Sequence, residues 1–181
     1  MFTKRKRNSP SLACVYNHSG NCWVRTMGEK NEHVCPVEKA GGLDSGIRKI
    51  VQRPKKILGN YVESGMTVLD LGCGPGFFSV EMAEMVGASG KVIAVDMQEG
   101  MLRKLESKIQ GTEIEKRIKL HKCDKDKIGI TEKVDLVLAF YMFHEVPDQK
   151  KFLGEIKSML KPKGEVFIGE PKFFHVSRPG I

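Results

Sequence analysis

A glycine-rich turn between a predicted strand and a predicted helix is the part of this sequence best suited to bind a ligand. The run Val68-Leu-Asp-Leu-Gly-Cys-Gly-Pro-Gly-Phe77 leads an apolar strand into Gly72, Gly74 and Gly76. Glycines allow a tight turn and let a ligand approach the backbone closely. A dinucleotide-binding fingerprint would place its third glycine at Phe77, and no Walker A phosphate-binding run exists, so neither motif matches.

Acidic residues lie at the ends of the first three predicted strands. Asp70, at the end of the first, would repel a pyrophosphate and suits a ligand with a cationic amino-acid end. Asp96 closes the second strand, where an acid accepts hydrogen bonds from ribose hydroxyls, the alternative being a strand-end cap. Asp124 follows the third strand and is placed to accept from the amino group of adenine, although Asp126 competes for that role.

An alternation of strands and helices must position these residues. Apolar, β-branched runs predict strands at 67–71, 91–96, 117–122, 134–141 and 165–169. Apolar residues at helical spacing lie between them, at 78–86, 102–109 and 152–160, with Pro147 placed to begin the last helix. The pattern predicts an α/β fold with a parallel, doubly wound sheet, in which ligands bind beyond the carboxyl ends of the strands.

The composition is that of a single globular domain with a basic N-terminal segment. Of the 181 residues, 40% are hydrophobic and 29% charged, and no apolar run is long enough to span a membrane. The odd number of cysteines does not indicate a disulfide framework, which favours the cytoplasm. The net charge is +8, and residues 1–26 contribute five basic residues and no acid. That cluster is weak evidence for nucleic-acid binding, and a solvated tail is the favoured interpretation.

Three segments are therefore expected. Residues 1–26 lack apolar periodicity and predict a disordered basic tail, and residues 27–64 predict a helical lid whose helix is kinked or split at Pro54. Residues 65–181 form the ligand-binding domain. The N-terminal cysteines and histidines do not have the spacing of common zinc sites, so no metal is expected; Cys35 is an alternative substrate-handling thiol.

The successive motifs resemble those of class I S-adenosylmethionine-dependent methyltransferases, in the group that includes small-molecule and quinone methyltransferases. The resemblance covers roughly residues 43–171 and rests on the segments Val68–Gly76, Val92–Met101, His121–Asp124, Asp135–Val146 and Leu160–Glu170. It implies a three-layer, Rossmann-like sandwich that binds S-adenosylmethionine and releases S-adenosylhomocysteine. The glycine turn then wraps the methionine moiety, Asp96 binds the ribose, Met97 packs on the adenine and Asp124 lies at its edge. The expected cofactor-binding set is Asp70, Gly72, Cys73, Gly74, Gly76, Phe77, Asp96, Met97, Asp124 and Phe140.

The segment Ala139–Val146, after the fourth strand, is expected beside the reactive sulfonium. His144 is a weak candidate for a general base, the alternative being an imidazole satisfied near a helix start. Glu145 is expected to charge the N-terminus of the next helix. Phe140, Tyr141 and Phe143 either line an apolar pocket or fill the core.

The substrate class is narrowed by what the sequence lacks. It has neither the Asp/Asn-Pro-Pro-Tyr run common in amino-nitrogen methyltransferases nor the Pro-Cys of cytosine-C5 enzymes, so a small-molecule acceptor is predicted. An RNA-modifying methyltransferase and a non-catalytic cofactor-binding module are the alternatives.

The C-terminal end carries a structural expectation. In the family that this chain resembles, strand five is followed by a helix and an antiparallel strand pair, and the eleven residues 171–181 are too few for these. We therefore predict about five parallel strands without the C-terminal antiparallel pair. Glu165–Gly169 is then an edge strand through which the domain forms homodimers.

Overall fold

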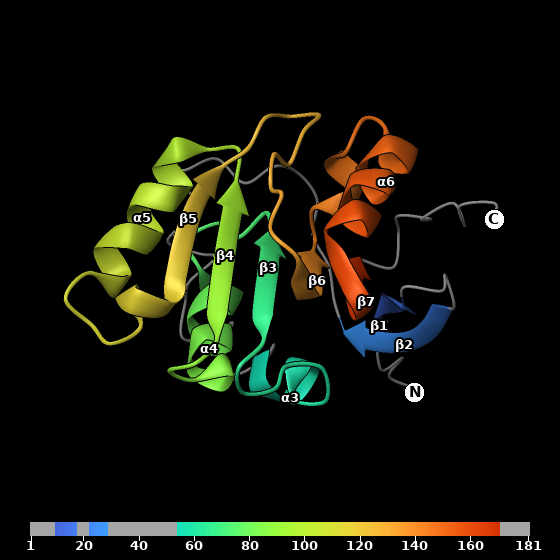
Figure 1. Ribbon diagram of the computed structural model, residues 1–181. Helices are drawn as coiled ribbons and strands as arrows, with labels where there is room; N and C mark the ends of the chain where they lie inside the picture. Colours follow the sequence, from blue (N-terminus) through green and yellow to red (C-terminus); the bar gives the residue numbers. More distant parts are fainter. Residues whose placement is uncertain (1–9, 18–21, 29–53, 171–181) are drawn as a thin grey trace, which may run out of the picture.

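A mixed sheet forms the centre of the computed structural model, which describes residues 10–17, 22–28 and 54–170 (Figure 1). Within these residues seven strands form one sheet in the order β2-β1-β7-β6-β3-β4-β5. Five of them, each parallel to its neighbours among the five, are β3 (Thr67–Leu71), β4 (Lys91–Asp96), β5 (Ile118–Lys122), β6 (Val134–Phe140) and β7 (Leu160–Glu170). The predicted five-stranded parallel sheet is confirmed.

Helices cover both faces of this sheet and give the three layers. They are α3 (Pro54–Leu58), α4 (Phe77–Val86), α5 (Glu99–Ile109) and α6 (Gln149–Met159), with short 3-10 turns η2 (Glu115–Arg117) and η3 (Phe143–Glu145). Apolar side chains of α3, α4 and α5 pack in one core cluster, and those of α6 pack in another against the opposite face. Figure 1 shows α6 beside β7 and α5 beside β5.

The ends of two helices refine the expectations. Pro54 is the first residue of α3, where its missing N–H costs nothing; the residues before it, where the predicted helix begins, lie outside the described part of the chain. Asp148 caps α6 by accepting a hydrogen bond from the amide of Lys151 (2.9 Å). The sequence analysis expected Glu145 at this N-terminus, and the structure places Asp148 there instead. Glu145 is thereby left for the site described below.

An antiparallel hairpin of β1 (Pro10–Asn17) and β2 (Cys22–Gly28) extends the sheet beyond β7. β1 pairs with β7 from Leu12 opposite Glu170 to Asn17 opposite Glu165. The predictions of a disordered tail across residues 1–26 and of an unpaired β7 edge are therefore wrong for these strands. Homodimerisation through that edge loses its basis.

The physical reason is that the absence of a helical apolar pattern does not exclude strands, whose stability here comes from pairing with β7. The two segments contain β-formers such as Val15, Tyr16, Trp23 and Val24, separated by turn-forming residues. The hairpin occupies the two antiparallel positions next to β7, the fifth of the predicted strands. The family resemblance assigned these positions to a C-terminal strand pair. The basic run Lys4–Arg7 lies outside the described residues.

Within residues 10–17, 22–28 and 54–170 no helix has the length and apolar character needed to cross a bilayer.

Candidate functional site

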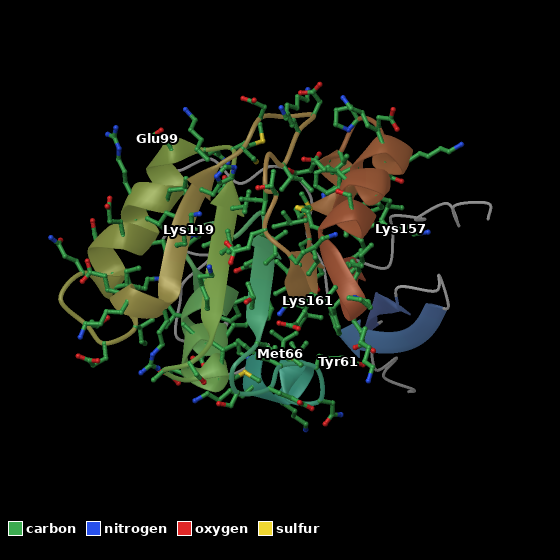
Figure 2. The ribbon with its side chains drawn as sticks, in the orientation of Figure 1. Tyr61, Met66, Glu99, Lys119, Lys157 and Lys161 are labelled. Atoms are coloured by element: carbon green, nitrogen blue, oxygen red, sulfur yellow. The ribbon has the colours of Figure 1, made fainter. Side chains whose placement is uncertain are left out.

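The candidate site lies where the carboxyl ends of the parallel strands meet. In Figure 2 this is the end of the sheet marked by Glu99, the first residue of α5, and Met66 and Tyr61 mark the opposite end. The first half of the site is formed by the ends of β3, β4 and β5. The second half is formed by the ends of β6 and β7.

The turn after β3 has a backbone that only glycine adopts easily. Gly72 and Gly76 have φ values of +66° and +83°. A side chain on Gly72 would meet Met142 Cβ at 2.8 Å, and one on Gly76 would meet Leu105 Cδ1 at 2.2 Å. These two glycines therefore let the turn pack tightly between the β6 loop and α5. Lys108 of α5 adds a hydrogen bond to the carbonyl of Pro75 at 2.5 Å.

The middle glycine differs from its neighbours because its open side faces no atom of the described residues. Gly74 has a φ of +53°, and a Cβ at this position would meet nothing within 4 Å in the described part of the chain. Its amide donates a hydrogen bond to Asp96 Oδ2 at 2.9 Å. The backbone at Gly74 is thus held in place from behind and remains open on one side, as expected where a ligand approaches the chain closely.

Asp96 connects the glycine turn to the start of α5. Its Oδ1 accepts from the amide of Gln98 at 2.8 Å while Oδ2 accepts from Gly74, and the residue is 6% exposed. Burial raises the pKa of Asp96, and the backbone hydrogen bonds from Gln98 and Gly74 act against that rise. Each carboxylate oxygen has a second lone pair, so both remain able to accept from ligand hydroxyls.

Asp70 is buried beneath the turn and does not lie on its surface. Its Oδ2 accepts a hydrogen bond from the hydroxyl of Ser79 in α4 at 2.5 Å. Burial raises the pKa of Asp70 to about 7, with the negative charge of Asp96 adding to the rise and the Ser79 hydroxyl opposing it. Two buried carboxylates with raised pKa values beside an open turn create a place that favours a cation.

Two other predicted residues of the turn are enclosed by protein. Cys73 is buried, its amide donates to the carbonyl of Val95 at 3.0 Å, and burial raises the pKa of its thiol well above the usual value. Phe77 is buried and packs edge-on against Phe78, with ring centroids 5.1 Å apart. Their side chains therefore support the turn from inside.

Met97 and Asp124 occupy exposed positions beside Asp96. Met97 is 44% exposed, the one large hydrophobic residue exposed in the described part of the chain. The amide of Cys123 donates to the carbonyl of Asp96 at 3.1 Å, which brings the exposed Asp124 next to the end of β4. Asp126 instead forms an ion pair with Lys151 of α6 at 3.4 Å, which favours Asp124 as the acid at this edge.

The chain after β6 makes a strained turn. Tyr141 has a φ of +59°, the one positive value at a non-glycine residue in the described ranges, and its amide donates to the carbonyl of Gly169 at 2.7 Å. Phe140 packs against Phe78 and Tyr141, with centroids 4.6 and 4.4 Å apart. Phe143 is fully buried near Phe152 of α6, so it belongs to the core rather than to a pocket wall. Such backbone strain clusters at functional sites.

The strained turn delivers His144 to the end of β7. The Nδ1 atom of His144 lies 2.6 Å from Glu170 Oε2, and the backbone amide of His144 donates to Glu170 Oε1 at 3.2 Å. The Nε2 atom of the same ring lies 3.8 Å from Glu145 Oε1. The imidazole is therefore held between two carboxylates from different elements.

Burial and charge act on both of these glutamates. Burial raises the pKa of Glu170, which is 2% exposed, and hydrogen bonds from the His144 ring and from the backbone of Phe143 and His144 oppose that rise. Burial also raises the pKa of Glu145, to which the charges of Glu170 and Asp96 add. The influence of Asp96 means that this second half of the site lies within electrostatic reach of the first.

Glu170 is the residue that the sequence analysis missed. It was part of a family motif but was given no role. The usable signal was its position: like Asp96, it is an acid that closes an apolar parallel strand at the carboxyl edge of the sheet.

Fold and site together define a Rossmann-like, cofactor-binding domain of the methyltransferase class. The methyltransferase domain family model matches residues 62–177, and the chain belongs to this family. A crystal structure of an S-adenosylmethionine-dependent methyltransferase from Aquifex aeolicus is 34% identical, with a TM-score of 0.70, and the match covers 75% of this chain and 72% of that one. The cofactor is S-adenosylmethionine.

Two curated relatives are demethylmenaquinone methyltransferases. The demethylmenaquinone methyltransferase of Lactobacillus johnsonii is 37% identical over 130 residues, which are 71% of this chain and 51% of that protein. The corresponding protein of Desulfitobacterium hafniense is 29% identical over 126 residues, 69% of this chain and 48% of that protein. The chain thus spans about half the length of the curated relatives it matches.

The residues present fit this cofactor. The open side of Gly74 is a space that a Cβ would fill. The buried carboxyl groups of Asp70 and Asp96, whose pKa values are raised, suit the cationic amino-acid end and the ribose of this cofactor. Exposed Met97 offers an apolar surface for a purine ring. The chemistry of the donor set therefore agrees with a positively charged nucleoside.

Proposed function

We propose that this domain catalyses methyl transfer from S-adenosylmethionine to a small aromatic acceptor of the hydroquinone type. The proposal rests on two sets of residues at the same edge of one sheet. The glycine turn and Asp96, at β3 and β4, suit a positively charged nucleoside, and His144 with its neighbouring glutamates lies at β6 and β7. The names of the relatives support the quinone class of acceptor. We place the reaction in the cytoplasm, as the composition predicts.

Each residue of the first half has a binding role in this proposal. Asp96 accepts the ribose hydroxyls, Met97 packs on the adenine and Asp124 accepts from its amino group. The turn from Gly72 to Gly76 follows the methionine moiety, and the buried charge of Asp70 favours its ammonium group. S-adenosylmethionine supplies a methyl group whose bonding electron pair leaves with the sulfur, giving S-adenosylhomocysteine.

The protein's contribution to catalysis is alignment and exclusion of water. Holding two reactants in line is worth about 7–11 kcal/mol in favourable cases, because their translational and rotational freedom is lost beforehand. Phe140 is buried at the end of β6, and Tyr141 beside it is partly exposed. These aromatic side chains provide an apolar boundary next to the loop that carries His144.

The test measures binding and turnover separately. Isothermal titration calorimetry is expected to give a micromolar dissociation constant for S-adenosylmethionine, about −8 kcal/mol. Methyl transfer is then assayed by mass spectrometry with a short-chain reduced demethylnaphthoquinone, and in parallel with total RNA as an alternative acceptor. A methylated quinol supports the proposal. Methylated RNA alone, or cofactor binding without turnover on the quinol, contradicts it.

A further inference from the structure

We propose that Glu170 is a positioning residue that holds His144 with its proton on Nδ1, so that Nε2 accepts the proton of the acceptor's hydroxyl group. The inference deepens the proposed function and rests on it for the identity of the acceptor. The geometry of the pair is independent of the acceptor and can be tested without one.

Both carboxylate oxygens of Glu170 form hydrogen bonds to His144. A backbone N–H can only donate, so Glu170 Oε1 acts as an acceptor toward the amide of His144 at 3.2 Å. The second oxygen of the same group, Oε2, lies 2.6 Å from Nδ1, a distance typical of a charge-assisted hydrogen bond. We assign the proton of this second contact to Nδ1, because Glu170 then accepts on both oxygens and both hydrogen bonds favour its ionised form. A neutral imidazole then has its lone pair on Nε2.

Strand pairing on both sides of β7 holds the backbone of Glu170 in place. Glu170 is the last residue of β7, and its backbone is paired with Leu12 of β1 on one side, while its neighbour Gly169 pairs with Phe140 of β6 on the other. A side chain on Gly169 would meet the Phe140 ring at 2.5 Å, so the two strands approach closely here. The position of the carboxylate is thus set by the sheet and not by a loop.

Acidic groups flank both nitrogens of the His144 ring. Glu170 Oε2 lies 2.6 Å from Nδ1, and Glu145 Oε1 lies 3.8 Å from Nε2. The side chain of His144 is only 11% exposed, so a proton that Nε2 takes from the acceptor arrives between these two acids. Among the described residues the charge of Asp96 acts on Glu145.

The O–H bond of the hydroquinone breaks, its electron pair stays on the oxygen, and the proton forms a bond to His144 Nε2. The electron-rich oxygen activates the ring carbon that takes the methyl group, and the hydrogen on that carbon leaves to water as a proton. The imidazolium then returns its proton to the oxygen, which restores the hydroxyl group. One proton is released in total, and no oxidant or reductant is consumed.

The decisive measurement is the tautomer of His144 in the folded wild-type protein. Nitrogen NMR of histidine-labelled protein identifies the His144 signals by their loss in His144→Asn. The inference expects a protonated Nδ1 and an unprotonated Nε2, in the absence of any acceptor. A ring protonated on Nε2 overturns it, even if the protein turns over a quinol.

Variants supply the kinetic test. Glu170→Gln keeps the size of the side chain but allows the opposite tautomer, and we expect kcat to fall about 10²-fold or more, with the KM of the acceptor and the cofactor affinity unchanged. His144→Asn is expected to lower kcat by about 10²–10⁴-fold. In Glu170→Gln, which keeps the ring, the signal of a protonated Nδ1 at His144 should be lost.

A matched control separates positioning from structural support. Asp135 accepts from the amide of Thr67 at 2.8 Å and from Lys161 at 2.7 Å, at the start of β6 and the opposite end of the sheet. Asp135→Asn removes a comparable strand-end carboxylate, lowers the thermal midpoint and is expected to leave kcat unchanged. Equal losses of kcat in Asp135→Asn and Glu170→Gln overturn the inference. If no acceptor is methylated, the proposed function fails and the NMR result still decides the tautomer.

Discussion

The two halves of the site use buried carboxylates for opposite purposes. At β3 and β4, Asp96 accepts from the backbone amides of Gly74 and Gln98, and Asp70 accepts from the Ser79 hydroxyl. At β6 and β7, the carboxyl group of Glu170 is hydrogen-bonded to the imidazole of His144. The partners in the first half are fixed donors, and the partner in the second half is a ring nitrogen whose role as donor or acceptor depends on the tautomer.

In the proposed function this difference separates binding from proton transfer. A carboxylate bonded to backbone amides fixes the shape of a loop, so its loss should change affinity and stability. A carboxylate bonded to an imidazole fixes a tautomer, so its loss should change turnover. Four predictions, with their control variants, test whether the molecule divides along this line.

The largest effect is expected in the glycine turn. Gly76→Ala forces a Cβ to within 2.2 Å of Leu105 Cδ1 at a φ of +83°. Overpacking costs about 1–3 kcal/mol and the left-handed backbone about 1–2 kcal/mol, so unfolding in urea should show a loss of about 2–4 kcal/mol.

Gly74→Ala is the matched control for that prediction. Its φ of +53° carries the same backbone cost, but no atom of residues 10–17, 22–28 or 54–170 lies within 4 Å of the added methyl group. We expect a smaller loss of stability, about 1–2 kcal/mol, and a larger loss of cofactor affinity than stability alone would cause. Equal losses of stability in the two variants would contradict the packing of Gly76 against α5.

Asp96→Asn should give the next largest effect, seen in cofactor affinity rather than in turnover. The amide cannot accept from both Gly74 and Gln98, and it loses the negative charge that favours a cationic ligand. A hydrogen bond to a charged group is worth about 1.5–3 kcal/mol, which predicts a dissociation constant raised by roughly 10- to 100-fold in calorimetry.

The control for Asp96 is a nearby exposed acid. Asp126→Asn removes an ion pair with Lys151 that lies on the surface, and cofactor affinity should not change. If Asp126→Asn weakens binding and Asp124→Asn does not, the acid at the adenine edge has been assigned to the wrong residue.

A third variant tests whether the hairpin supports the second half alone. Ala13 of β1 lies opposite Gly169, next to the pairing of Leu12 with Glu170. Ala13→Pro removes a backbone donor from a strand paired on both sides, which costs about 1–3 kcal/mol when a buried partner is left unsatisfied. Turnover should fall while the dissociation constant of the cofactor stays the same. Ala13→Ser, which keeps the N–H, should behave as wild type, and equal loss of binding and turnover in Ala13→Pro would refute the division.

Much of the fold could be predicted because the parallel strands are buried on both faces and contain long apolar runs. The predicted bounds of β3 and β4 match the structure, since charge or glycine closes each strand. The hairpin was not predictable in the same way. The place of its strands is decided by pairing of β1 with the edge of β7, which is distant in sequence.

The site shows the same contrast. The glycine turn and Asp96 form a local βα motif with a fixed spacing, so the sequence reveals them. The pairing of His144 with Glu170 joins residues 26 apart and depends on the strained backbone at Tyr141. No local pattern encodes that contact, and only the sheet register brings it about.

The smallest effect concerns the pH dependence of cofactor binding. Burial raises the pKa of Asp70 from its ordinary value of 3.8 to about 7, and the nearby charge of Asp96 adds to this. The folded protein therefore binds this proton more tightly than the unfolded chain does. The stability that the protonated form contributes is complete below the unfolded value of 3.8 and is lost as pH rises to about 7.

A cationic ligand reverses this preference, because it favours ionised Asp70. The dissociation constant of S-adenosylmethionine should be constant above about pH 7 and should rise by up to about tenfold for each pH unit below it. Ser79→Ala removes the hydrogen bond that opposes the rise in pKa, so the midpoint should move to higher pH. Asp70→Asn should abolish the dependence. Calorimetry between about pH 6 and 8 that gives one constant affinity for wild type would mean that the charge of Asp70 does not act on the ligand, and the first half of the site would then rely on Asp96 alone.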